Sequence, residues 1–284
     1  MFSAPEPYFL RAGDQFLDLG KPVVMGILNL SPDSFFSASR AESMEILVKK
    51  AASMLEDGAG ILDIGALSSR PGSSEIRVEE EVSLLIPGIR AVKNAFPDAL
   101  LSADVYRAEV ARAALSEGVG IINNIAGIQA SDELLETIAA NRAACILMHS
   151  RGDFSLMHQA NEYSNLATDV ASELKFAISR AQQAGVSDII ADPGFGFSKN
   201  VEQNFRLFRD LKYLHILDCP LLAGISRKSM VYRSLDCGPE EALNGSTALH
   251  MAALMQGIHI LRVHDVKEAR EVVTLFEKLC LPES

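Results

Sequence analysis

This sequence of 284 residues contains little positive charge and no long apolar run. Its 26 Lys and Arg residues are outnumbered by 37 Asp and Glu residues, and the net charge of −11 argues against nucleic acid or an anionic membrane as the main partner. No apolar run approaches the roughly 18 residues that a membrane span requires, and residues 1–8 lack the apolar stretch of a signal peptide. We therefore expect a cytoplasmic protein without nucleic-acid or membrane partners.

Cysteine and zinc motifs are lacking as well. The four cysteines are scattered without a C-x-x-C pair, which favours buried free thiols in a reducing cytosol over disulfides. The histidines show no H-E-x-x-H pattern, so a zinc site is not expected. No internal repeat is present, and the 48% hydrophobic content is enough for one large core. We predict a single domain over residues 1–284.

What the sequence does have is eight short apolar runs, each ending on a polar or charged residue. Helical patterns lie between the runs, and this alternation predicts βα units and a parallel sheet. Eight such units predict an α/β fold of the closed (β/α)₈ TIM-barrel type, in which reactive groups collect at the C-terminal ends of the strands. The runs are 23–28, 61–64, 100–103, 121–122, 145–148, 189–191, 221–225 and 258–261.

Residues 1–21 precede the first run and form a predicted extension of the barrel. Within them, residues 9–19 carry Gly13-Asp14 at their middle, which is typical of a β-hairpin. Such a hairpin would plug the N-terminal mouth of the barrel. Three connections, 29–40, 68–79 and 151–164, are longer than packing requires, and long loops at one mouth are typical places for ligand contacts.

Candidate anion-binding groups follow the first, second and eighth runs. Arg70 lies in a Ser-Ser-Arg-Pro-Gly segment, and the alternation in Arg262-Val263-His264 places both polar side chains on one face of a strand. Arginine offers a planar fork for phosphate oxygens, and histidine adds a donor. Asn29 should lie close to this pair because the first and eighth strands of a closed barrel are neighbours. Its amide oxygen suits Mg²⁺, which often bridges to phosphate.

Asp104, Asn123 and Asp192 form a second group, at the ends of the third, fourth and sixth runs. Three acceptor-rich side chains suit a ligand with fused N–H and NH₂ donors, since a carboxylate accepts two hydrogen bonds from an amidine-like edge. A carboxylate pair for acid–base hydrolysis is the alternative interpretation, and the sequence supplies no distance to test it.

Lys228 follows the seventh run, in Ser-Arg-Lys-Ser. A lysine there suits either a Schiff-base nucleophile or a fixed donor to a ring or carbonyl, and the residues alone leave both open. The Gly-x-Gly in Asp192-Pro-Gly-Phe-Gly-Phe197 is too short for a dinucleotide fingerprint, and we interpret it as a tight turn that presents Phe197.

Taken together, these segments resemble the dihydropteroate synthases, the folate-pathway enzymes that join 4-aminobenzoate to a dihydropterin methyl diphosphate. The set covers the whole chain in the right order and is far more specific than any one piece. The matching segments are MGILNLSPDSF (25–35), DIGALSSRPG (63–72), SADVYRAEVARAAL (102–115), IINNIAG (121–127), MHSRG (148–152), DPGFGF (192–197), GISRKS (224–229) and RVHDV (262–266).

The resemblance implies a role for each candidate residue. The implied pterin contacts are Asp104, Asn123, Asp192 and Lys228. The implied diphosphate contacts are Asn29 (with Mg²⁺), Ser69, Arg70, Arg262 and His264. The implied 4-aminobenzoate contacts are Pro71, Phe197, Lys228 and Ser229, under a loop bearing Asp33 and Phe35. In this family diphosphate leaves before the aniline nitrogen attacks, so Asp33, Arg70 and Lys228 assist catalysis without a protein nucleophile.

Some positions differ from the usual family pattern. Ser31 and Ser69 stand where Thr is common, Asn124 replaces a common Asp, and Leu67 replaces a common Glu. Two rival functions remain, a methyltransferase that passes a methyl group to a corrinoid protein and a non-catalytic pterin-binding paralogue. The resemblance also implies a homodimer formed through late barrel helices and predicts small-molecule substrates as the partners.

Overall fold

The computed structural model describes residues 6–30, 40–66, 76–152, 157–159 and 161–280. Eight parallel strands form one sheet in the spatial order β8-β7-β6-β5-β4-β3-β10-β9. A parallel bridge between Ala191 and Leu221 joins β8 to the run that contains β9 and closes the barrel. The strands are β3 (Val23–Asn29), β4 (Ile61–Gly65), β5 (Leu101–Asp104), β6 (Ile121–Asn124), β7 (Ala144–Met148), β8 (Ile189–Asp192), β9 (Leu222–Ala223) and β10 (Ile260–Val263). The predicted (β/α)₈ TIM barrel is therefore confirmed.

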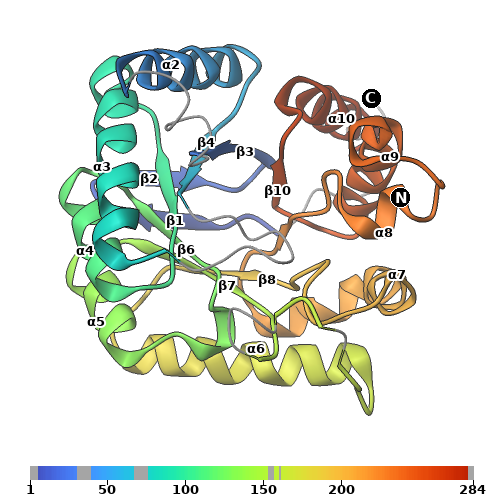
Figure 1. Cartoon of the computed structure of the whole chain (residues 1–284). Helices are drawn as coiled ribbons and strands as arrows, with labels where there is room; N and C mark the ends of the chain where they lie inside the picture. The colour runs from blue at the N-terminus through green and yellow to red at the C-terminus, as the bar shows by residue number, and fades with distance from the viewer. Residues whose placement is uncertain (1–5, 31–39, 67–75, 153–156, 160, 281–284) are drawn as a thin grey trace.

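Helices surround the strands, as Figure 1 shows. They have apolar residues at helical spacing on the face that meets the sheet; in α10, for example, Val266, Ala269 and Val273 are all buried. The helices are α2 (Arg40–Glu56), α3 (Val78–Ala95), α4 (Ala108–Ser116), α5 (Asp132–Ala140), α6 (Leu166–Gln183), α7 (Val201–Arg209), α8 (Ser229–Tyr232), α9 (Leu243–Leu254) and α10 (Val266–Leu279), with the 3₁₀ turns η1 (Gly127–Gln129), η2 (Leu211–Leu217) and η3 (Pro239–Glu241).

The N-terminal segment forms the predicted hairpin, from β1 (Phe9–Ala12) and β2 (Gln15–Asp18). Leu10, Leu17 and Leu19 are buried in one cluster with the first residues of the barrel strands, including Ile121 and Ile260. The hairpin therefore covers the N-terminal mouth with apolar side chains. Ligand-binding groups are therefore expected at the opposite mouth, where the strands end.

The seventh strand differs in length from its prediction. The apolar run 221–225 contains only two residues in strand conformation, those of β9. After it the chain enters a turn in which the Lys228 N–H donates to the Ile225 carbonyl, and Arg227 adopts a φ of 55°. The strand is short because this turn carries the chain into α8.

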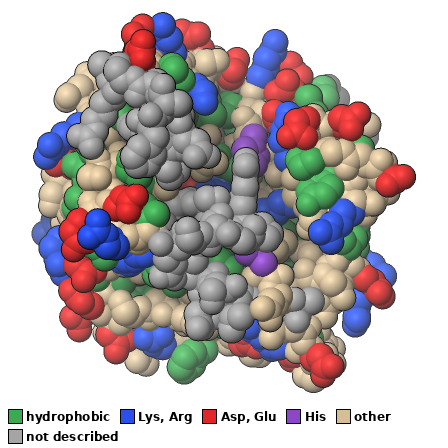
Figure 2. Space-filling view, in the orientation of Figure 1, with side chains coloured by type: hydrophobic (Ala, Val, Ile, Leu, Met, Phe, Trp, Pro, Cys, Tyr) green, Lys and Arg blue, Asp and Glu red, His purple; other side chains and the backbone are tan. Residues whose placement is uncertain are grey.

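Acidic and basic side chains are interspersed around the face of the molecule seen in Figure 2. No helix among the described residues is long and apolar enough to cross a membrane.

Candidate active site

Side chains of β4, β5, β6 and β10 meet in one buried polar network. The Arg262 guanidinium donates from Nε to Asp63 Oδ2 over 2.7 Å and from Nη2 to Asp104 Oδ2 over 2.6 Å. The Asn123 amide donates to the same Asp63 oxygen over 3.0 Å. Residues that are up to 199 positions apart in the sequence are thus brought together at the mouth of the barrel.

Asp63 is a member of this network that the sequence reasoning missed. It lies in the middle of β4 and is fully buried. A signal was present, because Asp63 interrupts the apolar run Ile61-Leu62-Asp63-Ile64, and an acid in a barrel strand must find a partner. The alternation at 262–264 predicted Arg262 beside His264 at an anion site. The structure shows in addition that two nitrogens of Arg262 are bonded to carboxylates.

The burial of these charges changes their protonation. Burial raises the pKa of Asp104 to about 7; the Arg262 guanidinium opposes this shift, whereas the Asp63 and Glu81 carboxylates add to it. The same two aspartates hold the pKa of Arg262 above its usual value against the effect of burial. Asp104 therefore changes charge near neutral pH, while Arg262 remains cationic.

Three buried oxygen atoms of β4 and β5 have no hydrogen-bond partner among the described residues. They are Asp63 Oδ1, Asp104 Oδ1 and Ser102 Oγ. Buried polar atoms are almost always paired in folded proteins, and leaving one unpaired costs about 1–3 kcal/mol. These oxygens therefore suit a ligand that presents several N–H donors.

Asp192 and Lys228 line a neighbouring wall of the site. Asp192 ends β8, and its Oδ1 accepts the Gly194 N–H over 2.8 Å. The Lys228 ammonium donates to the Phe195 carbonyl and lies 4.4 Å from the centre of the Phe197 ring. Burial lowers the pKa of Lys228 to about 8, and the Asp192 carboxylate opposes that shift. Burial likewise raises the pKa of Asp192, which Lys228 opposes.

An apolar wall continues from Phe197. Phe197 packs in one buried cluster with Ile125, Met148 and Met157, and its ring stacks on His158 with centroids 5.0 Å apart. Ser229 begins α8 directly after Lys228. Phe197, Lys228 and Ser229, which the sequence proposed as contacts of one ligand, thus lie on connected elements.

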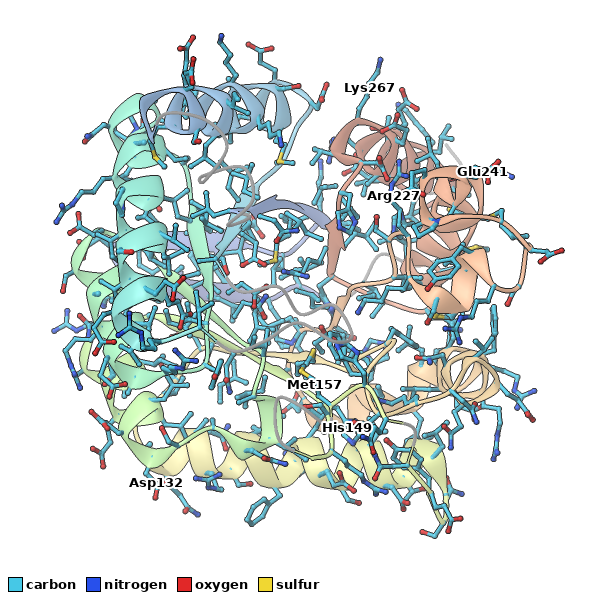
Figure 3. All side chains as sticks on the ribbon, viewed as in Figure 1. Asp132, His149, Met157, Arg227, Glu241 and Lys267 are labelled. Atoms are coloured by element: carbon cyan, nitrogen blue, oxygen red, sulfur yellow. The ribbon has the colours of Figure 1, made fainter. Side chains whose placement is uncertain are left out.

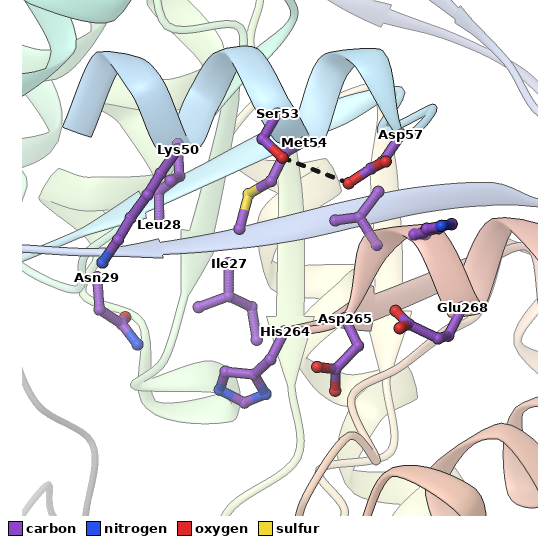
Figure 4. A pocket seen from close by; sticks show the side chains of 12 residues that line it. Ile27, Leu28, Asn29, Lys50, Ser53, Met54, Asp57, His264, Asp265 and Glu268 are labelled. Carbon is purple, nitrogen blue, oxygen red and sulfur yellow. Dashed lines mark hydrogen bonds between the residues drawn. The ribbon is translucent and has the colours of Figure 1, made fainter. Parts of the chain in front are cut away.

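Asn29 and His264 line a pocket of about 520 Å³ at the ends of β3 and β10 (Figure 4). The two strands pair directly, with Met25 opposite Arg262, which confirms their predicted adjacency. His264 Nδ1 lies 3.1 Å from the Ser226 hydroxyl, which also accepts the His264 backbone N–H. In the tautomer with its ring proton on Nε2, His264 accepts the Ser226 hydroxyl proton at Nδ1. Lys50 extends toward Asn29 from α2.

The remaining predicted positions are either outside the described residues or have another role. Asp33, Phe35, Ser69, Arg70 and Pro71 lie outside the described residues, as do Ser31 and Leu67. Asn124, where the family commonly has Asp, is fully buried; its amide donates to the Gly127 carbonyl and its oxygen accepts the Ala126 N–H. An aspartate would not supply the first of these bonds, so Asn124 has a structural role in the turn after β6.

Metal ligands are sparse in the described residues, where no three His, Cys, Asp or Glu side chains gather in the manner of a metal site. Asn29 is exposed and offers an amide oxygen, the type of hard ligand that Mg²⁺ uses together with water and phosphate oxygens. The site therefore fits an ion that arrives with a phosphorylated ligand better than one held by protein alone.

Sequence comparisons agree with this geometry. A family model described as "Pterin binding enzyme" matches residues 25–264. The dihydropteroate synthase of Escherichia coli K12 is 41% identical over 263 residues, covering 92% of this chain and 93% of its own length. That of Clostridium beijerinckii is 37% identical over 263 residues, with 91% and 95% covered.

Solved structures give the same result. The Yersinia pestis dihydropteroate synthase in complex with a sulfonamide drug superposes with a TM-score of 0.88 at 38% identity, covering 96% of this chain and 99% of that one. The Thermus thermophilus enzyme in complex with 4-aminobenzoate gives 0.85 at 34% identity, covering 96% and 100%. Family match, relatives and fold therefore agree that this chain belongs to the pterin-binding enzymes and, among them, to the dihydropteroate synthases.

Proposed function

We propose that the protein joins 4-aminobenzoate to (7,8-dihydropterin-6-yl)methyl diphosphate, giving 7,8-dihydropteroate and diphosphate in folate biosynthesis. The observation that carries this proposal is the buried polar cluster at the barrel mouth, in which Asp63 Oδ1 and Asp104 Oδ1 have no hydrogen-bond partner among the described residues. A pterin edge, with its ring N–H and exocyclic NH₂ side by side, supplies donors of that kind. Family membership gives the reaction, and the pocket gives a reason why this chain would bind its substrate.

We assign the pterin to Asp104, Asn123, Asp192 and Lys228. Asp104 offers an Oδ1 that has no hydrogen-bond partner among the described residues, and Asp192 lies close enough to Lys228 for each to oppose the other's pKa shift. Lys228 then donates to the ring while it is aligned by the Phe195 carbonyl. Buried charged partners of this kind make strong, directional hydrogen bonds.

We assign the diphosphate to Asn29, Arg262 and His264, together with Ser69 and Arg70 from the segment outside the described residues. The Arg262 bonds to the aspartates use Nε and Nη2, so Nη1 is the nitrogen that we direct toward the leaving group. We assign His264 the tautomer with its ring proton on Nε2, which can donate to a phosphate oxygen while Nδ1 accepts from Ser226. Mg²⁺, which we propose as the metal, would be held by Asn29 and would neutralise charge on the diphosphate.

We assign 4-aminobenzoate to Phe197, Lys228 and Ser229, with Phe35 and Pro71 completing the subsite. Departure of diphosphate leaves a cationic pterin methylene, and the aniline nitrogen attacks that carbon and then loses a proton. The protein needs no nucleophile for this sequence; it places the two reactants and stabilises the leaving group, with Asp33 and Arg70 assisting. Sulfonamides, which share the aniline, would occupy the same subsite.

The test is turnover by the purified full-length protein. Mixing pterin diphosphate, 4-aminobenzoate and Mg²⁺ should release diphosphate and form dihydropteroate in equal amounts, and omission of 4-aminobenzoate should stop product formation. A pterin-binding paralogue would bind the pterin without this turnover. A corrinoid methyltransferase would instead transfer a methyl group from a methylated pterin. Either result overturns the proposal.

We also propose a cytoplasmic homodimer. Exposed apolar side chains on α6 and η2, namely Phe176, Tyr213 and Ile216, surround a groove of about 440 Å³ on the late half of the barrel. Exposed apolar patches of this kind commonly mark protein interfaces. Light scattering should give a mass of two chains of 30.7 kDa each, and Phe176→Glu should reduce the measured mass to that of a single chain. A wild-type protein that is monomeric at micromolar concentration would contradict this assignment.

A further inference from the structure

The turn after β8 is held by two lysines from opposite sides. On one side, Lys228 donates to the Phe195 carbonyl and packs its side chain against Gly196, where an added Cβ would lie 3.0 Å from Lys228 Cδ. On the other side, Lys199 donates from Nζ to the Gly194 and Phe197 carbonyls, each over 3.1 Å. The first lysine belongs to the proposed active site; the second is buried and touches no proposed ligand.

Lys199 has a third partner, His149, which follows β7. Nζ lies 3.0 Å from His149 Nδ1, and His149 Nε2 lies 3.1 Å from Glu173 Oε2 on α6. Figure 3 shows His149 over α6. Burial lowers the pKa of His149 to about 4, so the ring is neutral at physiological pH. The Glu173 carboxylate fixes the ring proton on Nε2, which leaves Nδ1 to accept from Lys199.

Glu173, the last residue in this series of contacts, is itself held by other side chains. Glu173 is paired with the Arg151 guanidinium, which also stacks over the Tyr163 ring at 4.1 Å. Burial of Lys199 lowers its pKa to about 7, an effect that nearby Asp192 opposes. The ammonium form of Lys199 has three N–H donors, one for each carbonyl of the turn and one for His149 Nδ1. The neutral amine has two, which is enough for the carbonyls alone.

The two ends of the turn are fixed to different extents. Asp192 belongs to the sheet, since its carbonyl accepts the His149 N–H over 2.8 Å and it pairs with Met148. Phe197 lies beyond the sheet, where its carbonyl meets Lys199 and its N–H donates to the Gly194 carbonyl over 3.1 Å. Loss of Lys199 would remove this donor from both carbonyls. The neighbours of Phe197 keep bonds of their own, since the Gly196 N–H donates to Asn204 Oδ1 and the Ser198 N–H to the Met157 carbonyl, so the expected effect is a local shift of Phe197.

We propose that Lys199 is a positioning residue for the aryl-amine subsite: it holds the turn 194–197 in the conformation that places the Phe197 ring beside Lys228. The inference rests on the proposed function, because Phe197 and Lys228 are the groups assigned there to 4-aminobenzoate. It predicts a selective defect. Binding of the aryl amine depends on Phe197 and should weaken, whereas three of the four pterin contacts, Asp104, Asn123 and Asp192, are fixed by the sheet and should persist.

The first experiment is Lys199→Met in the full-length protein. The KM for 4-aminobenzoate should rise at least about 10-fold, since displacement of a positioning group by about 1 Å can cost as much as 100-fold. The dissociation constant of the pterin, measured by calorimetry without the aryl amine, should stay within about 3-fold of the wild type. A general loss of stability, measured below the unfolding temperature, would not raise the KM for 4-aminobenzoate while leaving the dissociation constant of the pterin unchanged.

A pair of histidine variants tests the same contact without changing Lys199. In His149→Asn the amide oxygen takes the place of Nδ1 and still accepts from Lys199, although the contact with Glu173 is lost. In His149→Gln the amide nitrogen takes the place of Nε2 and keeps the Glu173 contact, although the acceptor for Lys199 is lost. The Gln variant should raise the KM for 4-aminobenzoate and the Asn variant should not.

His259→Gln is the matched stability control. His259 is equally buried, accepts the Leu221 N–H at Nδ1 over 3.1 Å and contacts the Glu6 carbonyl through Nε2 at 3.0 Å, near the opposite mouth of the barrel. This variant should lose thermal stability and keep both constants.

The outcomes separate clearly. A folded Lys199→Met protein with an unchanged KM overturns the inference, as does a His149→Gln variant that matches His149→Asn; the histidine pair decides alone if Lys199→Met does not fold. Equal rises in both constants would also contradict it. Failure of the proposed function is a different result, namely a wild-type protein that forms no dihydropteroate.

Discussion

Arg262 donates to Asp63 over 2.7 Å, and both side chains lie inside the barrel mouth rather than in solvent. Asp63 is fully buried and its carboxylate pairs with this one guanidinium, while Arg262 divides its donors between Asp63 and Asp104. An isolated carboxylate would be costly in this position, so the pair is stable only as a unit. Asp63 thereby fixes the guanidinium at the edge of the proposed pterin and diphosphate subsites.

Replacement of Asp63 by Asn should show this dependence. Asp63→Asn keeps the volume but removes the charge that orients Arg262 Nε, so pterin affinity should fall about 10- to 100-fold, equivalent to about 1.4–2.7 kcal/mol. Calorimetry of pterin binding measures the change. Asp18→Asn, on the exposed edge of β2, is the control and should bind as the wild type does. If Asp63→Asn bound the pterin as tightly as the wild type, the ion pair between Asp63 and Arg262 would not support pterin binding.

Pterin binding should depend on pH through Asp104. Its pKa is raised to about 7, so the carboxylate takes up a proton as the pH falls through 7. N–H donors of the ligand prefer the carboxylate form, so affinity should be highest above pH 7 and should decrease toward pH 6. Calorimetry at several pH values measures this slope. A profile that is flat from pH 8 to 6 would contradict the assignment of Asp104 to the ligand donors.

Lys228 should act as a donor and not as a nucleophile. Its ammonium is already bonded to the Phe195 carbonyl and lies over the Phe197 ring, a geometry that suits binding to both substrates. Lys228→Ala should remove most turnover. Borohydride treatment of the wild type in the presence of both substrates should leave the protein mass unchanged. A covalent adduct on Lys228 would instead establish a Schiff base.

Acid stability should depend on a buried histidine outside the site. His250 on α9 is buried, and neither ring nitrogen has a hydrogen-bond partner among the described residues. Burial lowers its pKa to about 4, against about 6.5 in the unfolded chain. The unfolded state therefore takes up a proton first, and His250 should cost up to about 3 kcal/mol of folding stability as the pH falls from 6.5 to 4.

His250→Leu tests this expectation. Denaturant unfolding at pH 7 and pH 5 should show a smaller loss of stability on acidification in the variant than in the wild type. An identical slope in His250→Leu would show that His250 is protonated in the folded protein as readily as in the unfolded chain.

Much of this protein is determined by its sequence alone. Each barrel strand is a short apolar run, and each run ends on a polar residue, so the period and the order of the runs predict both the (β/α)₈ barrel and the mouth at which Asp104, Asn123 and Asp192 gather. The N-terminal hairpin follows in the same way from a glycine turn between short strands. These features are local, and local patterns are what a sequence displays directly.

Only the tertiary structure decided which side chains become partners. Arg262 meets Asp63 across 199 residues, and Lys199 meets His149 across 50, because closure of the barrel places the ends of distant strands side by side. The sequence predicted Arg262 as a ligand for anions, but it did not show the two buried carboxylates that the fold places beside this guanidinium. Burial, which sets the pKa of Asp104 and forces each buried donor to find an acceptor, exists only after the strands have assembled.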